Sequence, residues 1–136
     1  MSPLNLSWVF GPFPGSGGNI DNPEWTIVAE KLNIAFEAGG GVTLETEDEH
    51  ELPQCLQVQS ENGAYRVTFG HAPFGDWRVL SYKNPEAVDA DEPVEIGGYK
   101  WKRKCICYDP QDVIAVFAEY FQNQRVPTKL LDPGSS

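Results

Sequence analysis

Residues 56–69 read LQVQSENGAYRVTF, and this stretch predicts a β-hairpin. On both arms apolar residues alternate with polar ones, which is the period of a strand with one buried face. Between the arms stands Asn62-Gly63, one of the strongest short-range signals for a two-residue hairpin turn. Residues 42–47 show the same alternation, and residues 77–82 read as a further strand. The hairpin therefore predicts the centre of a mostly antiparallel sheet.

Two helices are predicted on either side of these strands in the sequence. The first is expected over residues 23–38, with Asn22 as its cap and Pro23 in the first helical position. The second opens at Asp109-Pro110 and ends at Asn123-Gln124. Each carries apolar residues at helical spacing, so each has one face to bury.

Two further strands, over residues 4–10 and 99–108, complete the expected order β-α-β-β-β-β-β-α. The fold class that follows is α+β. We expect a mostly antiparallel sheet of five to six strands, with both helices on one face or one edge.

The length of 136 residues predicts a single domain spanning residues 1–136. A Gly/Pro-rich loop is expected over residues 11–21 and a frayed tail over residues 132–136. The longest apolar runs are too short to span a membrane, and the first residues lack the pattern of a secretory signal. We therefore expect a cytoplasmic protein.

Negative charge is concentrated in the first half of the chain. Residues 1–65 hold ten acidic residues and one lysine, Lys31, whereas residues 66–136 are close to balanced, and the total is −10. An acidic surface repels phosphate backbones, which disfavours direct nucleic-acid binding. The same surface attracts a basic protein and speeds the encounter, although solubility alone also explains an acidic composition.

The sequence offers little for catalysis or metal binding. Cys105 and Cys107 are two apart in the predicted strand 99–108, so they are expected on one face, as small buried hydrophobes. The two histidines, His50 and His71, stand apart from any recognisable nucleophile motif. The acidic run beginning at Glu45 lacks the residue order of a calcium loop. We therefore expect no catalytic residue, no cofactor and no metal.

The acidic run is instead the candidate binding site. It places five carboxylates within seven residues, between two predicted strands. Such density is tolerable only in solvent, so the alternatives are a solvated loop and a docking patch for a basic partner. A second acidic loop extends the patch if the fold brings the two together. The candidate partner-binding residues are Glu45, Glu47, Asp48, Glu49, Glu51, Asp89, Asp91 and Glu92.

Several short stretches also carry a family resemblance. They are residues 22–25 (NPEW), 40–44 (GGVTL), 56–58 (LQV), 62–65 (NGAY), 82–85 (YKNP), 96–101 (IGGYKW) and the terminal helix with Val126-Pro127. Together they resemble the immunity proteins of bacterial contact-dependent growth inhibition and related polymorphic toxin systems. The resemblance implies a cytoplasmic, non-enzymatic protein that binds and blocks one cognate toxin domain, often a nuclease. It implies no fixed contact residues, because each pair in such families has its own interface.

Two other functions stay open at this point. A small ligand-binding module or enzyme would use a cup in the sheet lined by Trp77, Tyr82, Trp101 and Tyr108. An oligomeric subunit would pair through an exposed strand edge. The lysine-rich residues 100–104 argue against such pairing, so a monomer is expected when the protein is free.

Overall fold

The computed structural model describes residues 3–11, 16–47, 52–73, 75–87, 92–127 and 131–132. Its strands are β1 (Leu4–Phe10), β2 (Gly18–Asp21), β3 (Gly40–Thr46), β4 (Cys55–Glu61), β5 (Ala64–His71), β6 (Arg78–Tyr82), β7 (Val94–Ile96), β8 (Tyr99–Trp101), β9 (Ile106–Cys107) and β10 (Leu131–Asp132). Its helices are α1 (Trp25–Ala38), α2 (Pro110–Asn123) and a short 3-10 helix, η1 (Arg103–Cys105). No helix in these ranges combines the length and apolar character that crossing a membrane requires.

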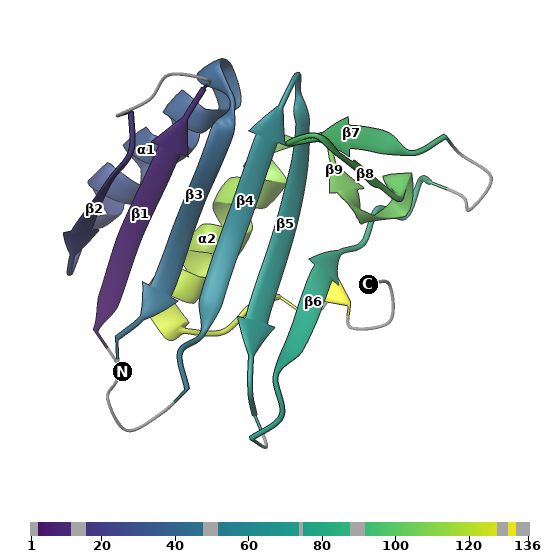
Figure 1. Cartoon of the computed structure of the whole chain (residues 1–136). Helices are drawn as coiled ribbons and strands as arrows, with labels where there is room; N and C mark the ends of the chain where they lie inside the picture. Colours follow the sequence, from purple (N-terminus) through teal and green to yellow (C-terminus); the bar gives the residue numbers. More distant parts are fainter. Residues whose placement is uncertain are drawn as a thin grey trace.

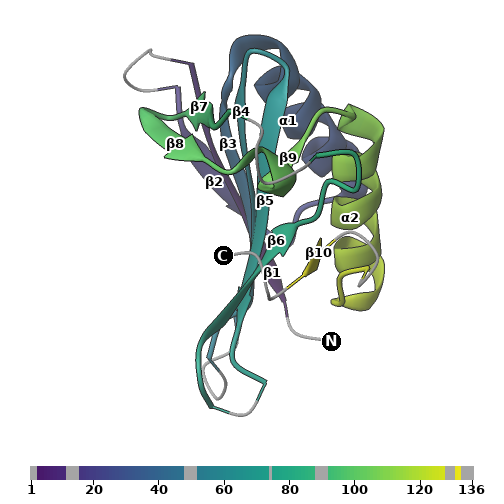
Figure 2. The ribbon, with the colours of Figure 1, turned by 90° about the vertical axis from the view of Figure 1, so that its right-hand side faces the viewer.

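One large antiparallel sheet organises the chain. Its strand order is β10-β6-β5-β4-β3-β1-β2, and β9 pairs with β5 (Figure 1). Both helices lie on one side of the sheet, and a separate hairpin of β7 and β8 lies on the other (Figure 2). This confirms the α+β class and the placement of both helices on one face. The sheet has more strands than expected, because the short strands β2, β9 and β10 add to its edges.

The main core lies between the sheet and the helices. The helical residues that are fully buried there are Val28, Leu32, Ala35, Val113, Val116, Phe117 and Tyr120. They face alternate residues of the strands, such as Leu44, Leu56 and Val67. Because side chains of a strand alternate between faces, this core commits the intervening residues to the other face.

The central hairpin forms as predicted. Leu56 pairs with Phe69 and Val58 with Val67 across β4 and β5. Asn62 and Gly63 both take positive φ, at 51° and 77°, which is the backbone of the favoured two-residue turn.

The second helix also forms as predicted, from Pro110 to Asn123. The Asp109 carboxylate caps it by accepting a hydrogen bond from the Gln111 N–H at 2.9 Å.

The predicted start of the first helix is wrong by two residues. The helix begins at Trp25, and neither Asn22 as cap nor Pro23 as first helical residue is confirmed. Asn22 instead has a φ of 51°, and its N–H donates to the Leu4 carbonyl oxygen at 2.8 Å. That bond extends the β1–β2 ladder, so the chain stays tied to the sheet until Pro23.

The loop predicted over residues 11–21 is wrong for residues 18–21, which form the edge strand β2. All four of its residues are exposed, so β2 has no apolar period to reveal it. At the other end of the chain, Asp132 belongs to β10, and residues 133–136 lie outside the described residues.

The single strand predicted over residues 99–108 is also wrong. The chain forms β8, then the 3-10 turn η1, then β9. A 3-10 turn breaks the two-residue period, so Cys105 and Cys107 do not share a strand face, although both are buried.

The preceding strand β7 pairs with β8 and was not predicted. Ile96 of β7 is 1% exposed and packs with Ala64 and Ile106, which fixes this hairpin against the sheet.

Candidate functional site: the uncovered face of the sheet

The face of the sheet opposite the helices carries mostly polar side chains. Strand alternation assigns to it Asn5, Ser7, Thr43, Glu45, Gln57, Gln59, Glu61, Arg66 and Thr68. The sequence pattern alone required this, because the intervening residues are the apolar ones of the core. We call this the open face.

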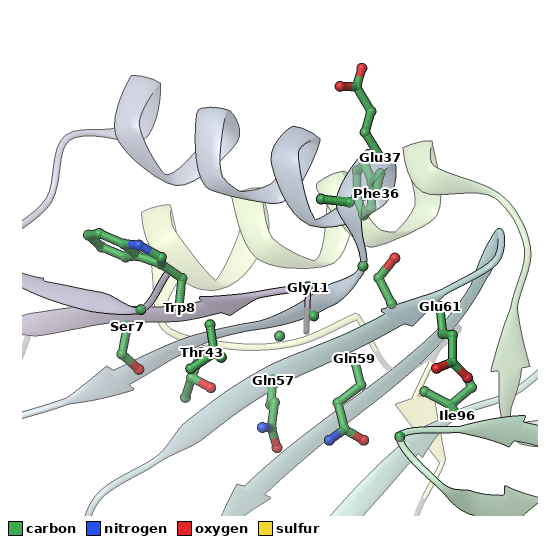
Figure 3. A pocket seen from close by; sticks show the side chains of 18 of the residues that line it. Ser7, Trp8, Gly11, Phe36, Glu37, Thr43, Gln57, Gln59, Glu61 and Ile96 are labelled. Carbon is green, nitrogen blue, oxygen red and sulfur yellow. The ribbon is translucent and has the colours of Figure 1, made fainter. Parts of the chain in front are cut away.

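A broad groove runs over the open face where β1, β3 and β4 lie side by side, with a volume of about 1040 Å³. Ser7, Thr43, Gln57 and Gln59 project into it from the strands, on the side away from the helices (Figure 3). The groove continues over the strand ends to the last turn of α1, where Phe36 and Glu37 line it. Ile96 and Gly97 of the β7–β8 hairpin line it on the β4 side.

Glycine residues keep the floor of the groove open. Gly41 sits on β3 directly across from Gln59, and the space above it is not filled by a side chain. A Cβ added at Gly41 would make one ordinary contact, 3.4 Å from the Val58 carbonyl oxygen. Next to it, Gly40 has a φ of 115° and lies against the backbone of Val9, so this position requires glycine.

Hydrogen-bonding groups of the groove are left without protein partners. In the described ranges no hydrogen bond engages the side-chain amide of Gln57 or of Gln59. Ser60 lies on the buried face of β4 with Leu56 and Val58, so its hydroxyl, which has no hydrogen-bond partner in the described ranges, is not presented on the open face. The two glutamine amides offer the groove donors and acceptors for a bound molecule.

The charged side chains that line the groove are carboxylates. Glu61, at the end of β4, stands on the open face, whereas Glu37, at the end of α1, lines the part of the groove at the strand ends and points its carboxylate away from the sheet (Figure 3). The neighbouring cation on the sheet, Arg66, is occupied elsewhere: its guanidinium lies 3.5 Å from the centroid of the Trp101 ring. Burial under this ring also lowers the pKa of Arg66. The groove therefore has an electrostatic preference for a cation.

The aromatic cup, which the sequence left open as an alternative site, does not form. The Tyr82 hydroxyl donates to Asp112 of α2 at 3.2 Å, which places this ring on the helix side of the sheet. Tyr108 is exposed and accepts a hydrogen bond from Arg103, while Trp101 covers Arg66. Trp77 lies over Gly70 at another part of the open face. The four rings therefore do not share a cavity.

The predicted acidic patch is described only in part. Asp48, Glu49, Glu51, Asp89 and Asp91 lie outside the described residues.

Of the three predicted acidic residues that are described, Glu45 and Glu47 lie at the end of β3. Glu92 leads into β7, which is at the opposite corner of the fold (Figure 1). The described residues therefore do not join the two acidic loops into one patch.

At the end of β3 the structure adds a carboxylate that sequence reasoning missed. Asp21 of β2 lies close enough to Glu47 for a side-chain hydrogen bond, and this contact is the main cause that raises the pKa of Glu47. The side-chain amide of Asn5 also donates a hydrogen bond to Asp21 Oδ1, at 2.7 Å. No sequence signal pointed to Asp21, because β2 was taken for a loop.

Replacing Asp21 with asparagine is expected to return the pKa of Glu47 toward its ordinary value. The substitution removes the repulsion by the Asp21 charge and replaces a carboxylate acceptor by a neutral amide, so that protonated Glu47 is favoured less. Because the raised pKa favours proton binding to the folded state, this contact stabilises the fold only at pH values low enough to protonate Glu47. Carbon-detected NMR titration of the Glu47 carboxyl would measure the change, and an unchanged midpoint in D21N would contradict the assignment.

The thiols and the described histidine do not assemble a reactive group. Burial raises the pKa of Cys107 and of Cys55, which disfavours the nucleophilic thiolate. Burial and the nearby Arg78 lower the pKa of His71, whose ring packs on Phe69. In the described part of the chain, no three potential metal-ligating side chains gather. His50 lies outside this part.

Comparisons with known proteins identify a family and a similar fold, and none of them indicates what the groove binds. A family model described as "Family of unknown function (DUF6911)" matches residues 7–130. A search of curated proteins finds no match. Among solved structures, the chain is similar to a hypothetical protein from Neisseria gonorrhoeae, with a TM-score of 0.74 and 16% sequence identity over 94% of this chain and 92% of that one. At this identity the likeness shows the fold alone.

Proposed function

The chain belongs to DUF6911, a family of unknown function, and we propose that its role is to bind and neutralise a cognate toxin domain in the cytoplasm. In this role it is an immunity-type protein without catalytic activity of its own. The observation that carries the proposal is the open face, a polar and acidic surface hollowed by a groove and left uncovered by the helices.

The build of the molecule supports a surface for a macromolecule. The helices and the core stiffen the sheet from one side, so the open face is presented with little loss of conformational freedom on binding. A standard protein interface buries about 1,600 Å² in total, so we expect the contact to extend beyond the groove over the open face. The groove alone, at about 1040 Å³, is at the upper limit of common small-molecule sites.

Charge supports a basic partner. The total charge is −10, and the described carboxylates at the β2–β3 end of the open face are Asp21, Glu45 and Glu47. A nuclease toxin holds its phosphate substrate with lysine and arginine, and carboxylates compete for the same groups. Neutralisation would follow from covering the substrate cleft or a surface beside it. Acidic steering would raise the association rate and make it fall with salt.

The proposal is tested with the purified protein and the toxin domain encoded by the neighbouring gene. Calorimetry is expected to give a one-to-one complex with nanomolar or lower Kd, weakening steeply between 50 and 500 mM salt, and the toxin activity is expected to stop at one equivalent. An absence of binding to that domain, or turnover of its substrate by the isolated protein, would contradict the proposal.

Charge reversal tests which carboxylates take part. The double variant E45K/E47K is expected to weaken binding by tenfold or more, mainly through a slower association rate, because rim charges act on steering. The matched control is E24K/E30K, two exposed positions at the start and on the outer side of α1, which changes the net charge equally and should change binding much less. Stopped-flow association rates of the two variants decide this. Equal effects of the two variants on the association rate would contradict the assignment of Glu45 and Glu47 to the interface, but they would not contradict the complex itself.

A further inference from the structure

We infer that the groove receives an extended, arginine-bearing segment of the partner, with Glu61 taking the guanidinium and Gln57 and Gln59 taking polar groups beside it. The identification of the segment as part of a toxin domain rests on the proposed function. The fit of the groove to such a segment rests on its own residues.

The spacing of the polar groups matches an extended chain. Gln57, Gln59 and Glu61 are alternate residues of β4, so they stand on one face at the two-residue repeat of a strand, about 6.8 Å apart. An extended segment lying along β4 carries its own side chains at the same repeat. The two amides and the carboxylate therefore have the same spacing as alternate side chains of an extended segment, the last of which is a cation.

The glutamine side chains on this face of β4 are available for binding. The amides of Gln57 and Gln59 engage no described partner, and each offers both a donor and an acceptor to a peptide. Gly41 leaves the space beside Gln59 open to a backbone.

The charge of the groove favours a cation, and the geometry of its polar groups favours arginine over lysine. The charged groups among the described lining residues are acidic, and Glu61 stands on the same face as the two glutamines, which disfavours phosphates and other anions there. A guanidinium offers a planar fork of donors, which fits a carboxylate and a neighbouring amide together better than the point charge of lysine does. The cation nearest on the sheet, Arg66, is held by Trp101 and does not occupy this place.

The aromatic rings of the groove argue against a stacked ligand such as a sugar or a nucleobase. Trp8 already has the Lys31 ammonium 4.4 Å from its ring centroid. Phe36 packs on Tyr65 with 4.9 Å between ring centroids. Stacking recognition needs a free ring face, and these two rings are engaged within the protein.

The test uses two synthetic peptides and the full chain labelled with nitrogen-15. One peptide has five residues and blocked ends, with threonine, threonine and arginine at its alternate positions and glycine between them, so that one face carries two polar side chains and one guanidinium. The other peptide replaces the arginine by citrulline, which has nearly the same shape and no charge. The arginine peptide is expected to shift the side-chain amide signals of Gln57 and Gln59 and the backbone signal of Gly41. The citrulline peptide is expected to bind at least tenfold more weakly.

A conservative variant assigns the cation contact. E61Q is expected to weaken the arginine peptide by about tenfold, the size of one charge-assisted hydrogen bond, whereas the exposed control E30Q should leave it unchanged. Equal binding of the two peptides, shifts confined to another surface, or no shifts at all would overturn the inference. Shifts of the same signals that grow with protein concentration alone would assign the groove to a second copy, and would overturn it too.

These outcomes separate this inference from the proposed function. If the arginine peptide binds in the groove while the toxin domain of the neighbouring gene is not bound, the toxin role fails and the groove assignment stands. If that domain is bound while the peptides and E61Q show nothing, the groove assignment fails and the toxin role stands.

Discussion

Replacing Gly41 with tryptophan is expected to reduce partner binding at least 100-fold while the protein stays folded. The position lies on the floor of the groove, so an indole there occupies the space that the partner needs. A loss of this size corresponds to about 2.7 kcal/mol, which is typical of a contact at the centre of an interface. The fold tolerates the change because a Cβ at Gly41 makes only an ordinary contact with the Val58 carbonyl oxygen, and aromatic residues suit strands.

Two measurements check this prediction. Calorimetry against the toxin domain, or NMR titration with the arginine peptide, gives the change in affinity, and thermal unfolding shows that the fold is kept. Tryptophan at Gly75, an exposed position before β6 that does not line the groove, has open space around it and serves as a control for a surface indole, although its positive φ of 87° costs some stability. Unchanged affinity in the folded Gly41→Trp variant would show that the groove is not used.

The second large effect is expected one residue earlier. Replacing Gly40 with valine should lower the free energy of unfolding by about 3 kcal/mol or more. The backbone φ of 115° at Gly40 is a region that a β-branched residue does not enter, and a Cβ would strike the Val9 carbonyl group. Relief requires moving β1 away from β3, which disrupts the ladder between Phe10 and Gly40.

Urea unfolding of two neighbouring valine variants measures this effect. Gly41→Val has ordinary backbone and an ordinary contact, so it is expected to unfold close to the natural protein. The difference between the two variants isolates the backbone requirement at Gly40 from the general effect of adding a side chain. Similar unfolding midpoints for Gly40→Val and Gly41→Val would contradict the account of this strand.

Local signals in the sequence were sufficient for the centre of the fold. The two-residue alternation of residues 56–69 with Asn62-Gly63 between the arms predicted β4 and β5, and Asp109-Pro110 predicted the start of α2. Both signals depend on a few neighbouring residues, so they can be recognised without knowledge of the rest of the chain. The same alternation misled in residues 99–108, because the apolar and charged residues continue their pattern through a turn that only the structure reveals.

The candidate site was less accessible to sequence reasoning. Gln57 and Gln59 were recognised as the solvent-facing positions of a strand, but nothing local shows that the surface above them is hollow. The groove requires the register of β1, β3 and β4 together with the β7–β8 hairpin, and these contacts join distant parts of the chain. The acidic run was visible as a charge cluster, yet its neighbour Asp21 becomes visible only when β2 pairs with β1.

The most direct test of the central proposal is an NMR map of the complex with the toxin domain encoded by the neighbouring gene. The open face is predicted to respond, with the largest shifts at the side-chain amides of Gln57 and Gln59 and smaller ones near Glu45. The outward surfaces of α1 and α2 are predicted to stay unchanged. Shifts concentrated on these helices, with the glutamine amides unaffected, would contradict the proposal that the uncovered side of the sheet is the binding surface.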